Sequence, residues 1–159
     1  MPLEKIDQTD VRILKQLQQD SRISTAELAN QINMSTSPCW RRVKQLEERG
    51  IIQGYGVFLN RKKMGMRVMV FIRVSIDSHS EKEAKKFEEQ VSALDNVVAC
   101  YSIGGDADFL IQVISQDLDT YAEFSMSVIR RLPGIKEMQS MFVLKELKPF
   151  LGFPVQVKK

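Results

Sequence analysis

The spacing of the hydrophobic residues changes near residue 66 of this chain. This change indicates that the chain forms two small domains. Before residue 50 the apolar side chains recur every three or four positions, which is the period of an amphipathic helix. From Val68 to Ile76 they alternate, which is the period of a half-buried strand. Each half of the 159 residues must therefore bury a lean core of its own.

Two helices are expected before the turn residue Asn33. The first follows the capping residue Asp7 and ends near Asp20. The second opens at Ser24, and Glu27 completes a capping box in which each side chain accepts a hydrogen bond from the other residue's amide.

A third helix is predicted from Ser35 to Arg49, with Cys39, Val43 and Leu46 as its inward stripe. Its outward face carries cations and hydrogen-bonding groups, which are Thr36, Ser37, Arg41, Arg42, Lys44 and Gln45, with Trp40 at the flank. A short turn between two helices, with such a face on the second, suits the major groove of duplex DNA. From the pattern alone, a surface for protein contacts stays open as the alternative.

Residues 51–59 are predicted to form short strands, as a wing or a linker ribbon, and the basic run at residues 61–63 indicates a boundary. One option for the tail is a final strand at Val155 to Val157. The expected parts are an N-terminal domain at 1–60, a linker at 61–66, a second domain at 67–145 and a C-terminal arm at 146–159.

The second domain is predicted to have the order strand, helix, strand, strand, helix, strand, which is a ferredoxin-like arrangement and makes the chain an α+β protein. Its first helix is expected to begin at a capping box of Ser80 and Glu83. Its second helix is expected to span Leu118 to Leu132. The expected strands are Val68 to Ile76, Val97 to Ile103, Phe109 to Ile114 and Ile135 to Leu144. Pairing the open face of so small a sheet with a second copy would enlarge its core, so we expect at least a dimer.

Little in the sequence indicates catalysis. The only histidine, His79, is read as a loop residue before a helix, and Cys39 and Cys100 form no CxxC pair. We therefore expect no enzyme, no metal site and no cofactor. The longest apolar run falls far short of the roughly 20 residues that span a bilayer, and the first residues lack a signal sequence, so we expect a cytoplasmic protein without a membrane partner.

The charge is concentrated at the front of the chain. Residues 1–66 carry 11 basic and 7 acidic residues, whereas the remainder carries 12 and 13. This modest excess is compatible with a polyanionic partner but is common on solvated helices.

The stretch from Ile6 to Tyr55 resembles the DNA-binding domain of the leucine-responsive regulator/asparagine-regulator (Lrp/AsnC) family. The resemblance rests on Ile6-Asp7-x-x-Asp10, Ile13-Leu14-x-x-Leu17-Gln18, Arg22-Ile23-Ser24, Glu27-Leu28-Ala29, Ser35-x-x-Pro38-Cys39-Trp40-Arg41-Arg42-Val43, Leu46-Glu47 and Gly50-Ile51-Ile52-x-Gly54-Tyr55. The second half resembles that family's effector domain at Cys100-Tyr101, Gly105-Asp106-x-Asp108-Phe109-Leu110, Tyr121 and Leu132-Pro133-Gly134. Phe109 is commonly tyrosine in the family.

The resemblance implies a sequence-specific transcription regulator, associated with the nucleoid, whose winged helix-turn-helix binds double-stranded promoter DNA. It also implies ferredoxin-like domains that pair into dimers and assemble further, with an octamer expected. The expected DNA contacts are Arg41 and Arg42 to base edges or phosphates, Ser35, Thr36 and Ser37 to phosphates, and Lys44 and Gln45 in the groove, with Trp40 beside them.

Members of this family bind amino acids at the loop that corresponds here to residues 104–108. The resemblance assigns the ligand's amino and carboxylate groups to Ile103, Gly104, Gly105 and Asp106, gives Asp108 a supporting role, and lets Leu118, Gln139 and Met141 complete the site from an adjoining subunit. The apolar side chains of Ile103, Leu118 and Met141 favour a hydrophobic amino acid such as leucine or methionine as the ligand. A plain turn is the alternative for this loop, because glycines permit positive φ and aspartates bond to the backbone.

A second hypothesis is a small-molecule sensor or enzyme built on the ferredoxin-like domain, with the N-terminal domain only mediating protein contacts. The sequence offers it no paired carboxylates, nucleophile or metal cluster.

Overall fold

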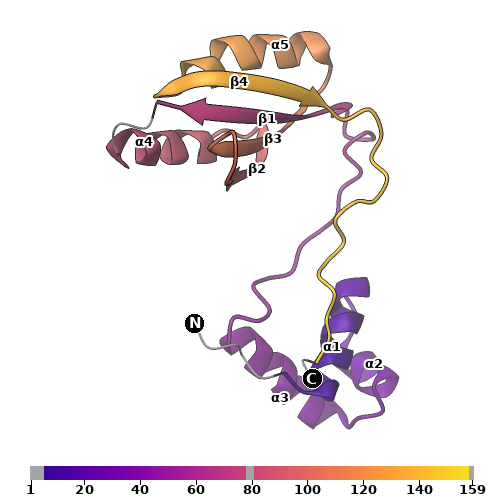
Figure 1. Cartoon of the computed structure of the whole chain (residues 1–159). Helices are drawn as coiled ribbons and strands as arrows, with labels where there is room; N and C mark the ends of the chain where they lie inside the picture. The colour runs from indigo at the N-terminus through magenta and orange to yellow at the C-terminus, as the bar shows by residue number, and fades with distance from the viewer. Residues whose placement is uncertain (1–5, 78–80, 158–159) are drawn as a thin grey trace. The chain divides into compact units, whose positions relative to one another are not determined.

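The structure is a computed structural model that describes residues 6–77 and 81–157 (Figure 1). The chain divides into two compact units, of which the second runs from Leu59 to Leu147. The first unit combines the chain up to Phe58 with the segment that begins at Lys148. The C-terminal arm thus belongs with the N-terminal helices, and not with the domain that precedes it in sequence.

Three helices build the first unit, and local capping explains where they begin. They are α1 (Gln8–Gln19), α2 (Thr25–Gln31) and α3 (Thr36–Glu48). The predicted capping box of α2 is present, with the amide of Glu27 donating to Ser24 and the amide of Ser24 donating to Glu27. Asn33 adopts a φ of 55° in the turn between α2 and α3, as its residue type allows. The predicted helix-turn-helix is confirmed.

The core of the first unit holds α3 by one face. Its buried members are Ile13, Leu28, Ala29, Ile32, Cys39 and Leu46. The last two lie on the predicted inward stripe of α3, and Val43 packs against them half-buried. Because these side chains point inward, the opposite side of α3 must face outward.

The second unit is a four-stranded antiparallel sheet in the order β2-β3-β1-β4. Its strands are β1 (Val68–Ile76), β2 (Val97–Ser102), β3 (Phe109–Ser115) and β4 (Ile135–Phe142), and its helices are α4 (Glu81–Ser92), α5 (Leu118–Ser127) and the 3₁₀ turn η1 (Ile129–Arg131). This element order confirms the predicted ferredoxin-like fold. The capping box at Ser80 and the loop residue His79 lie outside the described residues.

Both long helices cover the same face of the sheet. Phe87 of α4 is fully buried and its ring lies 4.6 Å from that of Phe109 on β3. Tyr121 of α5 contacts the ring of Phe142 on β4 at 5.4 Å. The alternate residues of the strands face the other way and are half-buried or exposed, namely Met69, Phe71, Leu110, Ile114 and Met141. The described part of the unit leaves this second face of the sheet open.

Three sequence expectations differ from the structure. No strand is assigned at residues 51–59 or at Val155 to Val157, because neither segment forms a ladder with another part of the described chain. The last long helix ends at Ser127 and continues only as the 3₁₀ turn. Leu132 must leave the helical region because a proline follows it, and its ψ is 148°.

Among the described residues, no helix combines the length and the apolar character needed to cross a membrane. The same residues contain no group of three or more His, Cys, Asp or Glu side chains placed to hold a metal ion.

Candidate nucleic-acid interface and effector site

The outward face of α3 is open to solvent at nearly every position that the sequence assigned to DNA. The exposed members are Ser35, Thr36, Ser37, Trp40, Arg41, Lys44 and Gln45. Ser35 is the N-cap residue, yet its hydroxyl makes no capping hydrogen bond. The first amides of a helix have no partner within the helix and carry a partial positive charge. The start of α3 therefore presents hydroxyls, amides and cations suited to phosphate oxygens.

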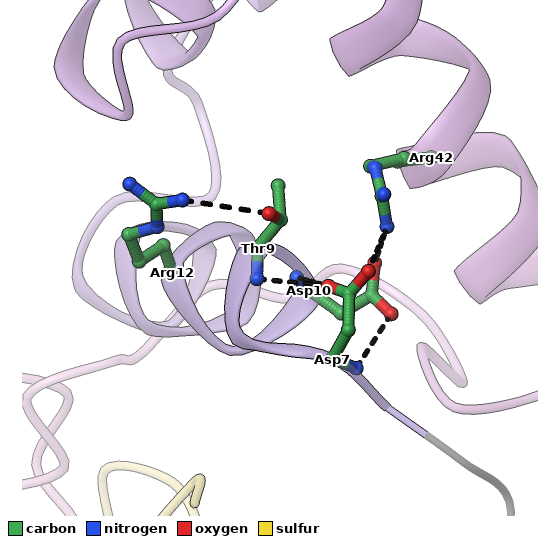
Figure 2. A network of polar contacts seen from close by, with 5 residues as sticks. All are labelled: Asp7, Thr9, Asp10, Arg12 and Arg42. Carbon is green, nitrogen blue, oxygen red and sulfur yellow. Dashed lines mark hydrogen bonds and ion pairs between the residues drawn. The ribbon is translucent and has the colours of Figure 1, made fainter. Parts of the chain in front are cut away.

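Arg42 is the exception, because its guanidinium is tied to the protein itself. Its Nη1 lies 2.8 Å from Oδ2 of Asp7 and 2.8 Å from Oδ1 of Asp10. Figure 2 shows the side chain reaching from α3 to the two carboxylates at the start of α1. The Asp10 side chain is only 9% exposed, so this ion pair is partly shielded from solvent. We call these three residues the α1–α3 tie.

The same carboxylates also begin α1. The amides of Thr9 and Asp10 both donate to Oδ1 of Asp7 at 2.8 Å, and the amide of Asp7 donates to Asp10 at 3.1 Å. The sequence identified Asp7 as a cap but identified neither acid as a partner of Arg42. The spacing of Asp7 and Asp10 within one helical turn was the only available signal, since it places both beside one another.

The tie makes the charges of its members more favourable in the folded state. The hydrogen bond from the Asp10 amide lowers the pKa of Asp7, and the Arg42 guanidinium adds to that effect against the opposing effect of burial. A carboxylate with a lowered pKa stabilises the fold fully above its ordinary pKa, about 3.9, and loses that contribution as pH falls through the lower folded-state value. The hydrogen bond to Asp10 raises the pKa of Arg42 in turn.

Trp40 and Lys44 stand at the edge of α3 beside a hollow of about 280 Å³. The ammonium of Lys44 lies 6.0 Å from the centre of the Trp40 ring. On the same side, the hydroxyl of Tyr55 donates to Glu47 at 2.7 Å, and burial together with this bond raises the pKa of Tyr55 to about 12. This bond fastens the segment after α3 to the helix.

The expected effector loop is braced from inside by Asp108. Its Oδ2 accepts from the amide of Ile76 at 2.8 Å, and its carbonyl accepts from the amide of Ile103 at 2.9 Å. Gly105 adopts a φ of 127°, a region that a side chain disfavours, while a Cβ there would meet nothing within 4 Å. The loop is thus a braced turn whose residues 104–106 are exposed to solvent.

Arg73 joins this loop to β4, and the sequence analysis missed it. Its guanidinium forms an ion pair with the exposed Asp106 and a 3.5 Å hydrogen bond with Gln139. The bond with Arg73 lowers the pKa of Asp106. A single cation at an open-face position of an otherwise apolar strand was the signal that could have identified Arg73.

The remaining expected effector residues lie apart within one chain. Met141 pairs with Phe71 on the open face, two residues along β4 from Gln139. Leu118 follows the far end of β3, since Ser115 pairs with Val68 while the loop adjoins the other end. Within one chain Arg73 therefore links the loop to Gln139, whereas Leu118 lies at the opposite end of the sheet.

Comparison with known proteins matches two successive parts of the chain to two families. Residues 6–53 match the family description "Winged helix-turn-helix DNA-binding", and residues 69–151 match "Lrp/AsnC ligand binding domain". The Bkd operon transcriptional regulator of Pseudomonas aeruginosa is 32% identical over 91% of this chain and 95% of its own length. The leucine-responsive regulatory protein of Escherichia coli K12 is 31% identical over 92% and 90%.

A solved structure is also similar throughout. A transcriptional regulator from Neisseria meningitidis, crystallised as an L-Met complex, has a TM-score of 0.91 and 33% identity. The match covers 94% of this chain and 97% of that one. The similarity therefore extends over both units.

Replacing Arg42 by alanine should lower the free energy of unfolding of the first unit by about 1–2 kcal/mol, because the shielded Asp10 carboxylate loses its cation. Urea denaturation followed by the fluorescence of the single tryptophan, Trp40, measures this change. Arg41→Ala on the exposed face is the matched control and should stay within about 0.5 kcal/mol of the parent. Equal stabilities of the two variants would contradict the tie.

Proposed function

Because the chain belongs to the Lrp/AsnC family of transcription regulators, we propose that it binds promoter DNA through α3 and answers to an amino acid through its second unit. The observation that carries the DNA part is the exposed face of cations and hydroxyls on α3. This proposal gives the protein a place at the nucleoid in the cytoplasm, where promoter DNA lies.

Within this proposal Arg41 and Arg42 have different roles. Arg41 is exposed and forms none of the ion pairs found in the described chain, so it is available for a base edge or a phosphate. Arg42 acts as a positioning residue, because the two aspartates occupy its guanidinium and fix the angle between α1 and α3. Lys44, Gln45 and the hydroxyls at the start of α3 supply further contacts.

We propose that the loop at residues 104–106 holds the amino and carboxylate groups of an amino acid. Supporting this, Asp108 braces the loop, residues 104–106 are exposed, and the similar Neisseria protein was crystallised as an L-Met complex. The apolar neighbour Met141 favours methionine or leucine over a charged amino acid.

The enzyme alternative has no such support. The relatives that match over nine-tenths of the chain are transcriptional regulators. The half-buried Asp108 carboxylate braces the turn and the exposed Asp106 carboxylate forms an ion pair, and neither is paired with a second carboxylate in the way that acid–base catalysis requires.

Self-association is also part of the proposal. The open face of the sheet exposes or half-exposes a run of large apolar side chains, which an isolated chain would leave in water. A second copy placed on that face would cover them, and further copies would bring Leu118 of one chain toward the loop of another. An effector that binds such a shared site shifts assembly by its differential affinity for the two states.

Replacing Arg41 by alanine should weaken binding to a fragment of the protein's own promoter by about 1–3 kcal/mol, because one contact to DNA is lost. Fluorescence anisotropy across a salt series measures this, and log affinity of the parent should fall linearly with log salt. Lys15→Ala, an exposed cation on α1, is the control. If the affinity of the parent protein for DNA did not change with salt, and if Arg41→Ala bound DNA as tightly as the parent, α3 would be excluded as the interface.

Methionine or leucine should raise the midpoint of thermal unfolding. A ligand at 100 times its Kd adds about 2.7 kcal/mol of stability. Asp106→Ala should remove this shift, whereas Glu89→Ala, which changes an exposed acid on α4, should retain it. A screen of the twenty amino acids in which none shifts the midpoint would count against an effector site in this loop.

Light scattering at micromolar concentration should give a dimer or a larger assembly. Phe71→Glu on the open face should reduce the mass, since it would bury a charge without a partner in the interface. Lys85→Glu on the exposed side of α4 is the control, and circular dichroism verifies that both variants remain folded. A monomeric parent protein would refute the proposed association.

A further inference from the structure

The C-terminal arm is held to α1 by one side chain. Nε2 of Gln18 donates to the carbonyl of Phe153 at 3.0 Å, and the amide of Phe153 donates back to Oε1 of Gln18 at 2.7 Å. Figure 1 shows the arm, in yellow, ending beside α1. The donor and the acceptor of a carboxamide lie side by side, as do the N–H and C=O of one residue in an antiparallel strand, so Gln18 can bond to both backbone groups of Phe153.

The residue before Phe153 is fitted to this pairing. Gly152 has a φ of 132°, which disfavours any side chain. A Cβ at this position would lie 2.0 Å from Oε1 of Gln18, far inside van der Waals contact. A side chain at residue 152 would therefore displace the Gln18 carboxamide from its pairing with Phe153.

The two phenylalanines of the arm contribute little to its attachment. Phe150 is 66% exposed and Phe153 is 74% exposed, and their rings pack on each other with centroids 5.1 Å apart. Val155 and Val157 are half-buried, and the pairing with Gln18 joins the arm to α1 by hydrogen bonds. A hydrogen bond between exposed groups shifts an equilibrium by roughly threefold to tenfold, so this attachment can open and close.

We propose that Gln18 and residues 152–153 form a clasp that fastens the arm to the DNA-binding unit. The chain passes between the two units twice, at residues 58–59 and at residues 147–148. With the clasp open, only the first passage restrains the DNA-binding unit. With the clasp closed, the arm becomes a second tether that arises directly after β4, the strand that carries Gln139 and Met141.

The effect of the clasp on DNA rests on the proposed function. Two tethers allow each DNA-binding unit fewer orientations than one tether does. With the clasp closed, the α3 helices of an assembly therefore lose less orientational freedom on binding a duplex than they would with the clasp open. Closing the clasp should therefore raise operator affinity. Phe153, the residue with which Gln18 pairs, lies after the part of the chain that matches the ligand-binding family, which ends at residue 151.

Hydrogen exchange on the full chain tests the clasp without DNA. The Phe153 amide should exchange at least about threefold more slowly in the parent than in Gln18→Ala, because the alanine removes its acceptor. Gln19→Ala, the exposed neighbour at the end of α1, is the control and should match the parent. Gly152→Ala should speed exchange in the parent and have a smaller effect when Gln18 is already alanine, since the clash is with Gln18. Equal exchange of Phe153 in the parent and in Gln18→Ala would overturn the clasp.

Operator affinity of the same variants tests the second tether. Gln18→Ala and Gly152→Ala should each weaken binding by about threefold to tenfold, whereas Gln19→Ala should not. Changed exchange with unchanged operator affinity would overturn the role in DNA binding. A parent protein that binds no DNA would overturn the proposed function, and exchange alone would then decide the clasp.

Discussion

A single guanidinium between two carboxylates links the start of α1 to the middle of α3. Asp7 and Asp10 satisfy the free amides of α1 and at the same time hold Arg42, so the same charges start one helix and orient another. The core grips α3 by its inward stripe, and the tie grips it from the side. What remains outward is the face that the proposal assigns to DNA. If the tie were absent, the shared apolar core alone would hold that face in its direction relative to α1.

In the second unit, one residue likewise connects two features, which are the open face of the sheet and the loop at residues 104–108. Its open sheet face leaves large apolar side chains without cover, and its braced loop exposes residues 104–106. Arg73 connects the two features, because it stands on the open face and holds the loop through Asp106. A ligand at the loop would therefore meet the same residues that a second copy would approach. This proximity is a physical basis for coupling an amino acid to assembly.

Sequence periodicity predicted the helix-turn-helix, the four strands and their order, because each element buries a face with its own period. It also predicted which side of α3 is exposed. It could not separate Arg41 from Arg42, since adjacent cations look alike until the position of the two aspartates is known. Strands at 51–59 and in the arm were expected from composition, yet a strand exists only through a partner, which local sequence does not supply. The pairing of Gln18 with Phe153 joins residues 135 positions apart and left no local pattern.

The structure of the complex with an operator duplex tests the central claim most directly. The account predicts α3 in the major groove, with Arg41 within hydrogen-bonding distance of the DNA and Arg42 still paired with Asp7 and Asp10. A complex in which α3 faces away from the duplex, or in which Arg42 leaves both aspartates to bind it, would contradict the account.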